Sequence, residues 1–284
     1  MYYIKSILKN TMANKLSFDK QVTIISALAE GVSIRGAERM TGVHRDTIMR
    51  LGAKVGNACA DYMDAKLVGL NCQRVEIDEL WGFIAKKNAN CRLGDYAEGL
   101  GDVYTFVALD ADTKLVPCFL SGKRNDTNTV AFLQDLRDRV NGRIEISSDG
   151  WAAYANAVDN AFGCEVDYGQ NVKVFSSPDK TEERRYSPAS IARIERSTIT
   201  GEPQHISTSL VEKQNHTVRM HCRRLARLTN AFSKKFDNFQ AAVGLHFAYY
   251  NFVKTHSAIR MTPAMAAGVE QSHLEVANLV ELAQ

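Results

Sequence analysis

The amino-acid sequence predicts an α/β fold, a mixed sheet flanked by helices, preceded by a small all-helical domain. Residues 17–56 space their apolar side chains as helices only. From residue 74 the pattern becomes that of strands, and strand candidates alternate with a helix up to residue 149. The chain has 284 residues, of which 45% are apolar and 24% charged, as is usual for a globular protein. This length allows one large domain and one small one.

Three short helices are expected at the start, over residues 18–30, 33–41 and 44–56. Gly31 ends the first helix, and Ser33 can cap the second. Gly42 allows a tight turn between the second and third.

This arrangement is typical of a helix-turn-helix, whose packing positions would be Ala37, Val43, Ile48 and Leu51. In that motif the third helix enters the DNA major groove. Its outward side chains would be Arg45, Thr47, Arg50 and Lys54. The alternative interpretation is a small three-helix bundle with a solvated basic face.

The sheet is expected to contain three strands, a helix and a fourth strand. Residues 74–78 form the first strand, and residues 80–87 either continue it or bend away. Residues 103–110 and 113–122 form the next two, followed by a helix over 125–140. Residues 143–149 form a further strand, and residues 151–158 a short helix.

The remaining chain divides into a polar part and a helical part. Residues 171–207 are polar and irregular, which indicates a long functional loop or an insertion. A long helix follows over 208–228, and a last one begins near Asp237. Thr262 caps a short turn that Gly268 ends. The expected division is an arm (1–16), a helix-turn-helix domain (17–60), a catalytic domain (73–268) and a tail helix (269–284).

Three carboxylates stand where a metal site could form. Asp78 and Asp149 each end a predicted strand, and Glu212 opens the long helix. Such side chains can converge at one sheet edge, where their mutual repulsion favours a bound cation. Mg²⁺ or Mn²⁺ prefers oxygen ligands, and a pair of such ions can drive attack on a phosphodiester. Nearby acids leave alternatives open: Glu76, Glu79, Asp110 and Asp112.

The segment after Glu212 carries charge of one sign. From Glu212 to Lys235 there are seven Lys or Arg and one acid, Glu212 itself. Helical spacing predicts Arg219 and Arg223 on the face of Glu212. We expect these two residues, with Arg224 and Arg227, to bind DNA phosphates.

Composition excludes several other classes of protein. Net charge is only +3, so total charge says little about partners. Six cysteines lie far apart without CxxC spacing, which argues against a zinc site and a disulfide framework. No apolar run reaches membrane-spanning length and no signal peptide is evident, so a cytoplasmic location is expected.

Four blocks resemble the DDE transposases of the insertion sequence 1 family. They are DELW from Asp78, SDGW from Ser148, the long block from Ser207 to Lys235, and YYNFVKTH with TPAMAAG between Tyr249 and Gly268. The resemblance implies an RNase H-like catalytic domain with Asp78, Asp149 and Glu212 as its acids and Arg219 as the basic residue after the Glu. Some relatives carry a cysteine-based zinc finger, which this chain lacks.

The resemblance also implies partners, cofactors and a bacterial source. The protein would bind double-stranded DNA at element ends and target, use two Mg²⁺ or Mn²⁺ ions, and act as a homodimer or higher oligomer. It would be cytoplasmic and associate with the nucleoid when bound to DNA. Two alternatives remain open: an RNase H-like nuclease that does not join strands, and a catalytically dead helix-turn-helix DNA-binding regulator.

Overall fold

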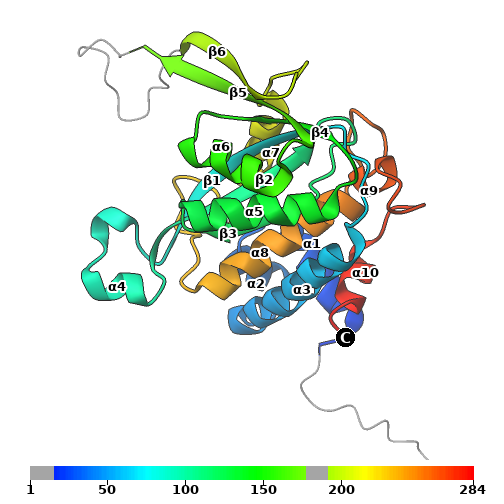
Figure 1. The fold of residues 1–284 in the computed structure, drawn as a ribbon. Coiled ribbons are helices and arrows are strands. Elements are labelled where there is room, and N and C mark those ends of the chain that lie inside the picture. The colour runs from blue at the N-terminus through cyan, green and yellow to red at the C-terminus, as the bar shows by residue number, and fades with distance from the viewer. Residues whose placement is uncertain (1–15, 177–190) are drawn as a thin grey trace, which may run out of the picture.

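The computed structural model describes residues 16–176 and 191–284, and its centre is a mixed six-stranded sheet (Figure 1). The strand order is β3-β2-β1-β4-β5-β6. Strands β1, β4 and β5 run parallel, whereas β2, β3 and β6 are antiparallel to their neighbours. The strands span Arg74–Ile84 (β1), Gly101–Asp110 (β2), Phe119–Gly122 (β3), Ile144–Ser148 (β4), Val166–Phe175 (β5) and Ile191–Thr200 (β6). The predicted α/β class is confirmed, and the architecture is consistent with an RNase H-like fold.

Helices cover both faces of this sheet. Helices α5 (Asp126–Arg139) and α6 (Ala152–Phe162) pack against each other, and α7 (Ser209–His221) packs against β1 and β2. Adjacent residues of a strand point to opposite faces. Asp78 contacts α7 and Glu79 contacts α6, so the two helices lie on opposite faces of β1.

Strand β1 is continuous through the segment for which the sequence left two possibilities. Residues 80–84 extend the strand begun at Arg74, and the pairing with β2 runs from Val75 to Ile84. The connection to β2 then forms an excursion with a 3₁₀ turn, η1 (Asn88–Asn90), and a short helix, α4 (Leu93–Ala97). This segment extends away from the sheet in Figure 1, and no helix was expected there from the sequence.

The three N-terminal helices form where the sequence predicts them. They are α1 (Phe18–Ala29), α2 (Ile34–Thr41) and α3 (Arg45–Lys66). The Ser33 hydroxyl accepts a hydrogen bond from the Gly36 amide, which confirms the predicted cap. Gly42 ends α2 in the left-handed conformation, with φ of 68°. A small cluster of Ile24, Ala37, Val43 and Ile48 holds the three helices together.

Helix α3 is longer than expected and enters the main core. It ends at Lys66, so the predicted domain boundary at residue 60 falls inside it. Its second half packs on α8 (Phe236–Ala248) so closely that a Cβ on Gly56 would lie 2.0 Å from the Ala241 carbonyl oxygen. Cys59 and Met63 belong to the core that the sheet helices share. Independent folding of residues 17–60 stays a prediction.

Part of the segment predicted as a polar loop is a β-ribbon. Strand β5 reaches Phe175 and pairs antiparallel with β6, so the interpretation of residues 171–175 and 191–200 as irregular loop is wrong. Nearly every residue of β6 is exposed, and a strand exposed on both faces has no apolar alternation to reveal it. Residues 177–190 of the predicted loop and residues 1–15 of the predicted arm lie outside the described residues.

The C-terminal part of the chain packs against the N-terminal helices. Helix α8 continues into a π-helical turn, η2 (Tyr249–Val253), followed by α9 (Pro263–Ala266) and α10 (Val276–Glu281). The Thr262 hydroxyl accepts a hydrogen bond from the Met265 amide, as its predicted capping role requires. Helix α10 packs against α1 and α3. Among the described residues, no helix combines the length and apolar character that crossing a membrane requires.

Candidate active site

Asp78 and Asp149 meet because of the register between two parallel strands. Glu76 of β1 pairs with Ser147 of β4, and each aspartate lies two residues further along the chain. Asp149 is the first residue past the end of β4, so its side chain is not confined to one face of the sheet. One carboxylate oxygen each from Asp78, Glu79 and Asp149 lies within 4.8 Å of the others.

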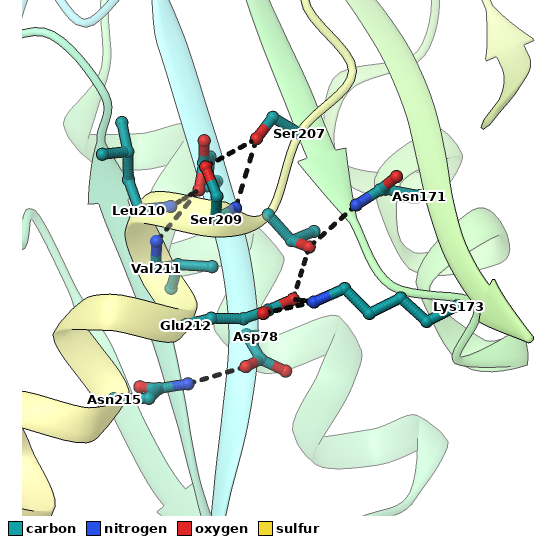
Figure 2. A network of polar contacts seen from close by, with 11 residues as sticks. Asp78, Asn171, Lys173, Ser207, Ser209, Leu210, Val211, Glu212 and Asn215 are labelled. Carbon is teal, nitrogen blue, oxygen red and sulfur yellow. Dashed lines mark hydrogen bonds and ion pairs between the residues drawn. The ribbon is translucent and has the colours of Figure 1, made fainter. Parts of the chain in front are cut away.

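Asp78 is largely buried within this cluster. Burial, together with the charges of Glu79 and Asp149, raises its pKa to about 7. The Asn215 side-chain amide of α7 donates a hydrogen bond of 2.8 Å to Oδ2 of Asp78 (Figure 2). Asp149 accepts a hydrogen bond of 2.9 Å from the Trp151 amide, which orients it at the start of α6.

Glu79 faces the other side of β1 and is already paired. Its carboxylate forms an ion pair with Arg124 and accepts a hydrogen bond of 2.7 Å from the Tyr154 hydroxyl. The Arg124 guanidinium stacks on the Trp151 ring, 3.7 Å from its centroid. Burial raises the pKa of Glu79, and Asp149 adds to the rise. From the sequence, Glu79 is only an alternative to the predicted acids.

Glu212 lies one helical turn before Asn215, the residue that donates a hydrogen bond to Asp78. It sits in the first turn of α7, where it accepts a hydrogen bond of 2.7 Å from the Thr208 hydroxyl. Both of its carboxylate oxygens contact the Lys173 ammonium of β5 (Figure 2). Residues three apart on a helix are neighbours, so Asn215 brings Glu212 to the side of the cluster. Glu212 is not one of the three acids that converge within 4.8 Å.

The other acidic candidates have structural partners. Glu76 is buried and accepts hydrogen bonds from the Leu210 and Val211 amides, which caps the start of α7. Asp110 accepts hydrogen bonds from the amides of the turn that follows β2. Asp112 forms an ion pair with Arg74. The contacts of these three acids therefore stabilise a helix start, a turn and an ion pair.

The acid cluster matches the donor set of a hard divalent cation. Neither Asp78 nor Asp149 forms an ion pair with a Lys, Arg or His within residues 16–176 and 191–284. Uncompensated carboxylates at this separation repel one another, and a cation with oxygen ligands removes that repulsion. The residues present therefore fit Mg²⁺ or Mn²⁺.

The basic residues after Glu212 have a different arrangement from the predicted one. Helix α7 ends at His221, so the prediction that Arg223 shares a helical face with Glu212 is wrong. Its Cys222 cap turns the chain into a loop that carries Arg223, Arg224 and Arg227. Arg224 donates hydrogen bonds to carbonyl oxygens of this loop, whereas Arg223 and Arg227 are exposed.

Arg219 remains on α7 but is half-buried. Its guanidinium donates hydrogen bonds to the carbonyl oxygens of Trp81, at 3.4 Å, and Leu225, at 3.1 Å. Burial lowers its pKa to about 10, which leaves it charged at neutral pH. The same side chain therefore ties the end of α7 to β1.

The predicted DNA-reading residues lie on two sides of α3. Helical spacing places Thr47, Arg50 and Lys54 on one face, and Arg50 and Lys54 are exposed. Arg45, the first residue of the helix, lines a cavity between α3 and the loop after α7. Arg45 therefore does not share the face of the other three.

Comparisons with known proteins give a likeness of fold only. No protein-family model matches the chain, and no curated protein matches it. Among solved structures, the fold is similar to the piggyBac transposase in its synaptic complex with hairpin DNA, at a TM-score of 0.40 and 10% identity. The similarity covers 97% of this chain and 73% of the other. The identity and the TM-score are too low to carry a functional assignment.

Proposed function

We propose that the protein is a metal-dependent DNA transposase that cleaves phosphodiester bonds and joins 3′-hydroxyl ends to target DNA. The observation that carries the proposal is the convergence of Asp78 and Asp149, which the parallel pairing of β1 and β4 brings close together. The blocks that resemble the insertion sequence 1 family contain Asp78 within β1, Asp149 just past β4 and Glu212 on α7, and the last block covers η2 and α9. The resemblance supplies the choice of DNA as substrate and of joining as the second step.

Asp78 and Asp149 would hold the metal, and Glu212 would complete the set. Glu212 already binds a cationic group, the Lys173 ammonium, with both oxygens. That pair is partly exposed, and pairs of this kind contribute little to stability, so a metal ion can replace it. Bound Mg²⁺ or Mn²⁺ supplies an activated water or hydroxyl and stabilises the leaving oxygen.

Glu79 would act as a positioning residue. Its Arg124 and Tyr154 partners occupy its oxygens, so it contributes negative charge behind Asp78 rather than an open ligand position. Arg124 in turn packs on Trp151, which fixes the turn that holds Asp149. Asn215 orients Asp78 from the opposite face of β1.

DNA would reach this site over basic side chains from two regions. Arg223, Arg227 and the half-buried Arg219 lie at and after the end of α7. Thr47 and Arg50 on α3 would read the element's terminal repeat in the major groove, and Lys54 would bind its phosphates. Because two ends must be held together, the active species would be a homodimer or higher oligomer on DNA.

A cleavage and joining assay tests the proposal. The substrate is a plasmid that carries this coding sequence with its natural flanking DNA, incubated with Mg²⁺, Mn²⁺ or EDTA. Asp78→Asn, Asp149→Asn and Glu212→Gln should each abolish nicking while DNA binding is retained. Two of these changes together should be no worse than one, because the residues act as a unit. Asp110→Asn is the matched control, because that carboxylate serves a turn.

The same assay separates the alternatives. Joining of a pre-cleaved 3′ end to a second DNA distinguishes a transposase from a nuclease. Absence of metal-dependent nicking in the wild type would leave only the DNA-binding regulator. Loss of Mn²⁺ binding in Glu79→Gln, with normal binding in Glu212→Gln, would replace Glu212 by Glu79 as the third ligand.

A further inference from the structure

The cavity that Arg45 lines lies apart from the acid cluster, between the N-terminal helices and the end of α7. Its volume is about 480 Å³, within the range of small-molecule sites. Its walls come from the end of α1, the first half of α3, one face of α8, and the loop that follows α7. The cavity therefore joins the predicted DNA-reading helix to the helix that carries Glu212.

The walls of this cavity are mainly apolar. Leu28, Ile48 and Met49 line it from the N-terminal helices, and Leu245 and Phe232 line it from the opposite side. Apolar walls of this kind accept a flat or compact organic group and exclude water from it.

Two buried polar side chains face this cavity without a partner. His246 is 5% exposed, and neither of its ring nitrogens has a hydrogen-bond partner among the described residues. The Ser233 hydroxyl, 1% exposed, is also unpaired within that part of the chain. Burial lowers the pKa of His246 to about 3, so the neutral ring offers one donor and one acceptor. Buried groups of this kind are costly unless something binds them.

The surroundings of the cavity favour an anion. Arg35, Arg45, Arg223 and Lys234 are exposed lining residues, and none of the described lining residues is an Asp or Glu. A matching ligand would have an apolar, planar group within the cavity and hydrogen-bonding atoms at its buried end. It would carry negative charge at the entrance. A nucleotide combines these three properties.

We propose that this cavity binds a single unstacked nucleotide, with its base edge against His246 and Ser233 and its phosphate among the rim arginines. Proteins that take a base out of the stack hold it in a fitted pocket and read its hydrogen-bonding edge. The nucleotide is either part of bound DNA or a free mononucleotide.

Distance favours a nucleotide of the DNA that the proposed function cleaves, and this part of the inference rests on that function. Within α7, His221 lies nine residues after Glu212, which corresponds to a rise of about 14 Å. At 3.4 Å per nucleotide of B-form strand, this is about four nucleotides. A strand with its reacting phosphate at the acid cluster would therefore reach the cavity a few nucleotides away.

Free-ligand binding tests the site without any DNA cleavage. The full-length protein in EDTA is titrated with the four deoxynucleoside 5′-monophosphates, the deoxynucleosides and inorganic phosphate, and the histidine ring signals are followed by NMR. The monophosphates should perturb the His246 signal and bind more tightly than the other two probes. His246→Phe and Ser233→Ala should each weaken binding roughly 3- to 10-fold, as expected for a lost hydrogen bond. His273→Phe makes the same change at an exposed position and should have no effect.

A second experiment tests whether the nucleotide belongs to bound DNA. An oligonucleotide with 2-aminopurine at successive positions should show increased fluorescence at one position, and His246→Phe should remove it. Response to monophosphates without a 2-aminopurine signal would assign the site to a free nucleotide. Equal binding of inorganic phosphate, or no binding of any probe, would overturn the proposal.

Failure of the proposed function would look different. The Asp149→Asn variant should bind monophosphates as the wild type does, because Asp149 belongs to the acid cluster and not to the cavity lining. Nucleotide binding without metal-dependent cleavage would leave the cavity assignment intact and remove the transposase assignment. Unfolding curves of His246→Phe and Ser233→Ala separate lost binding from lost structure.

Discussion

Removal of one charge from the acid cluster should stabilise the metal-free protein. One oxygen of each acid lies within 4.8 Å of the others, and two unit charges at that distance repel by about 3.5 kcal/mol at an effective dielectric of about 20. Solvent near Asp149 reduces this value, so we expect Asp78→Asn to gain about 1–2 kcal/mol in EDTA. The Asn215 hydrogen bond survives, since an asparagine oxygen at position 78 still accepts it.

The assay is thermal unfolding with and without Mn²⁺. For a chain of this size, 1 kcal/mol shifts the midpoint by about 2–4 °C, so Asp78→Asn should melt a few degrees higher in EDTA. Excess Mn²⁺ should stabilise the wild type by about 2.7 kcal/mol at 100 times its Kd and leave the variant unchanged. The control Asp110→Asn should lose stability in both buffers, because its oxygens accept hydrogen bonds from the turn amides.

Lower stability of Asp78→Asn in EDTA would refute the reasoning. It would mean that the Asp78 carboxylate stabilises the fold, as Glu76 does at the start of α7. Equal Mn²⁺ stabilisation of the wild type and the variant would place the metal elsewhere.

Three further predictions concern the rest of the molecule. Gly56→Ala should cost at least about 1–3 kcal/mol in urea unfolding, since its Cβ would lie 2.0 Å from the Ala241 carbonyl oxygen, and a neutral result would show that α3 and α8 can separate. Arg50→Ala should reduce preference for the terminal repeat roughly tenfold in competition binding, whereas Lys54→Ala should weaken all DNA alike; equal effects would remove base reading from α3. Arg219→Ala should lower the unfolding free energy by about 1–3 kcal/mol through its lost carbonyl contacts, and unchanged stability would leave it a phosphate-binding role only.

The sequence by itself determined the elements whose apolar pattern repeats. The helices of the N-terminal region follow their periodicity and their caps, as Ser33 illustrates. Strands β1, β2 and β4 follow from buried runs bounded by turn residues. The placement of Asp149 just past a strand end was also predictable, whereas the prediction that Asp78 ends its strand is wrong, because β1 continues to Ile84.

Segments without a regular apolar pattern could not be assigned from the sequence. Strand β6 is exposed on both faces, and β5 continues into it as a ribbon, so neither alternation nor burial distinguishes this region from a loop. Helix α7 ends at His221 although helical spacing continues beyond it, since the loop packs Leu225 into the core instead. Periodicity cannot report where tertiary packing interrupts a helix.

Only the tertiary structure decided which charges meet. The parallel register of β1 and β4 sets Asp78 beside Asp149, and no local pattern contains a register between strands so far apart in sequence. Glu79 joins the cluster because Asp149 lies past the end of its strand, and Glu212 meets Lys173 because the ribbon passes over α7. Residue types and local periods come from the chain, whereas the distances between carboxylates come from long-range packing.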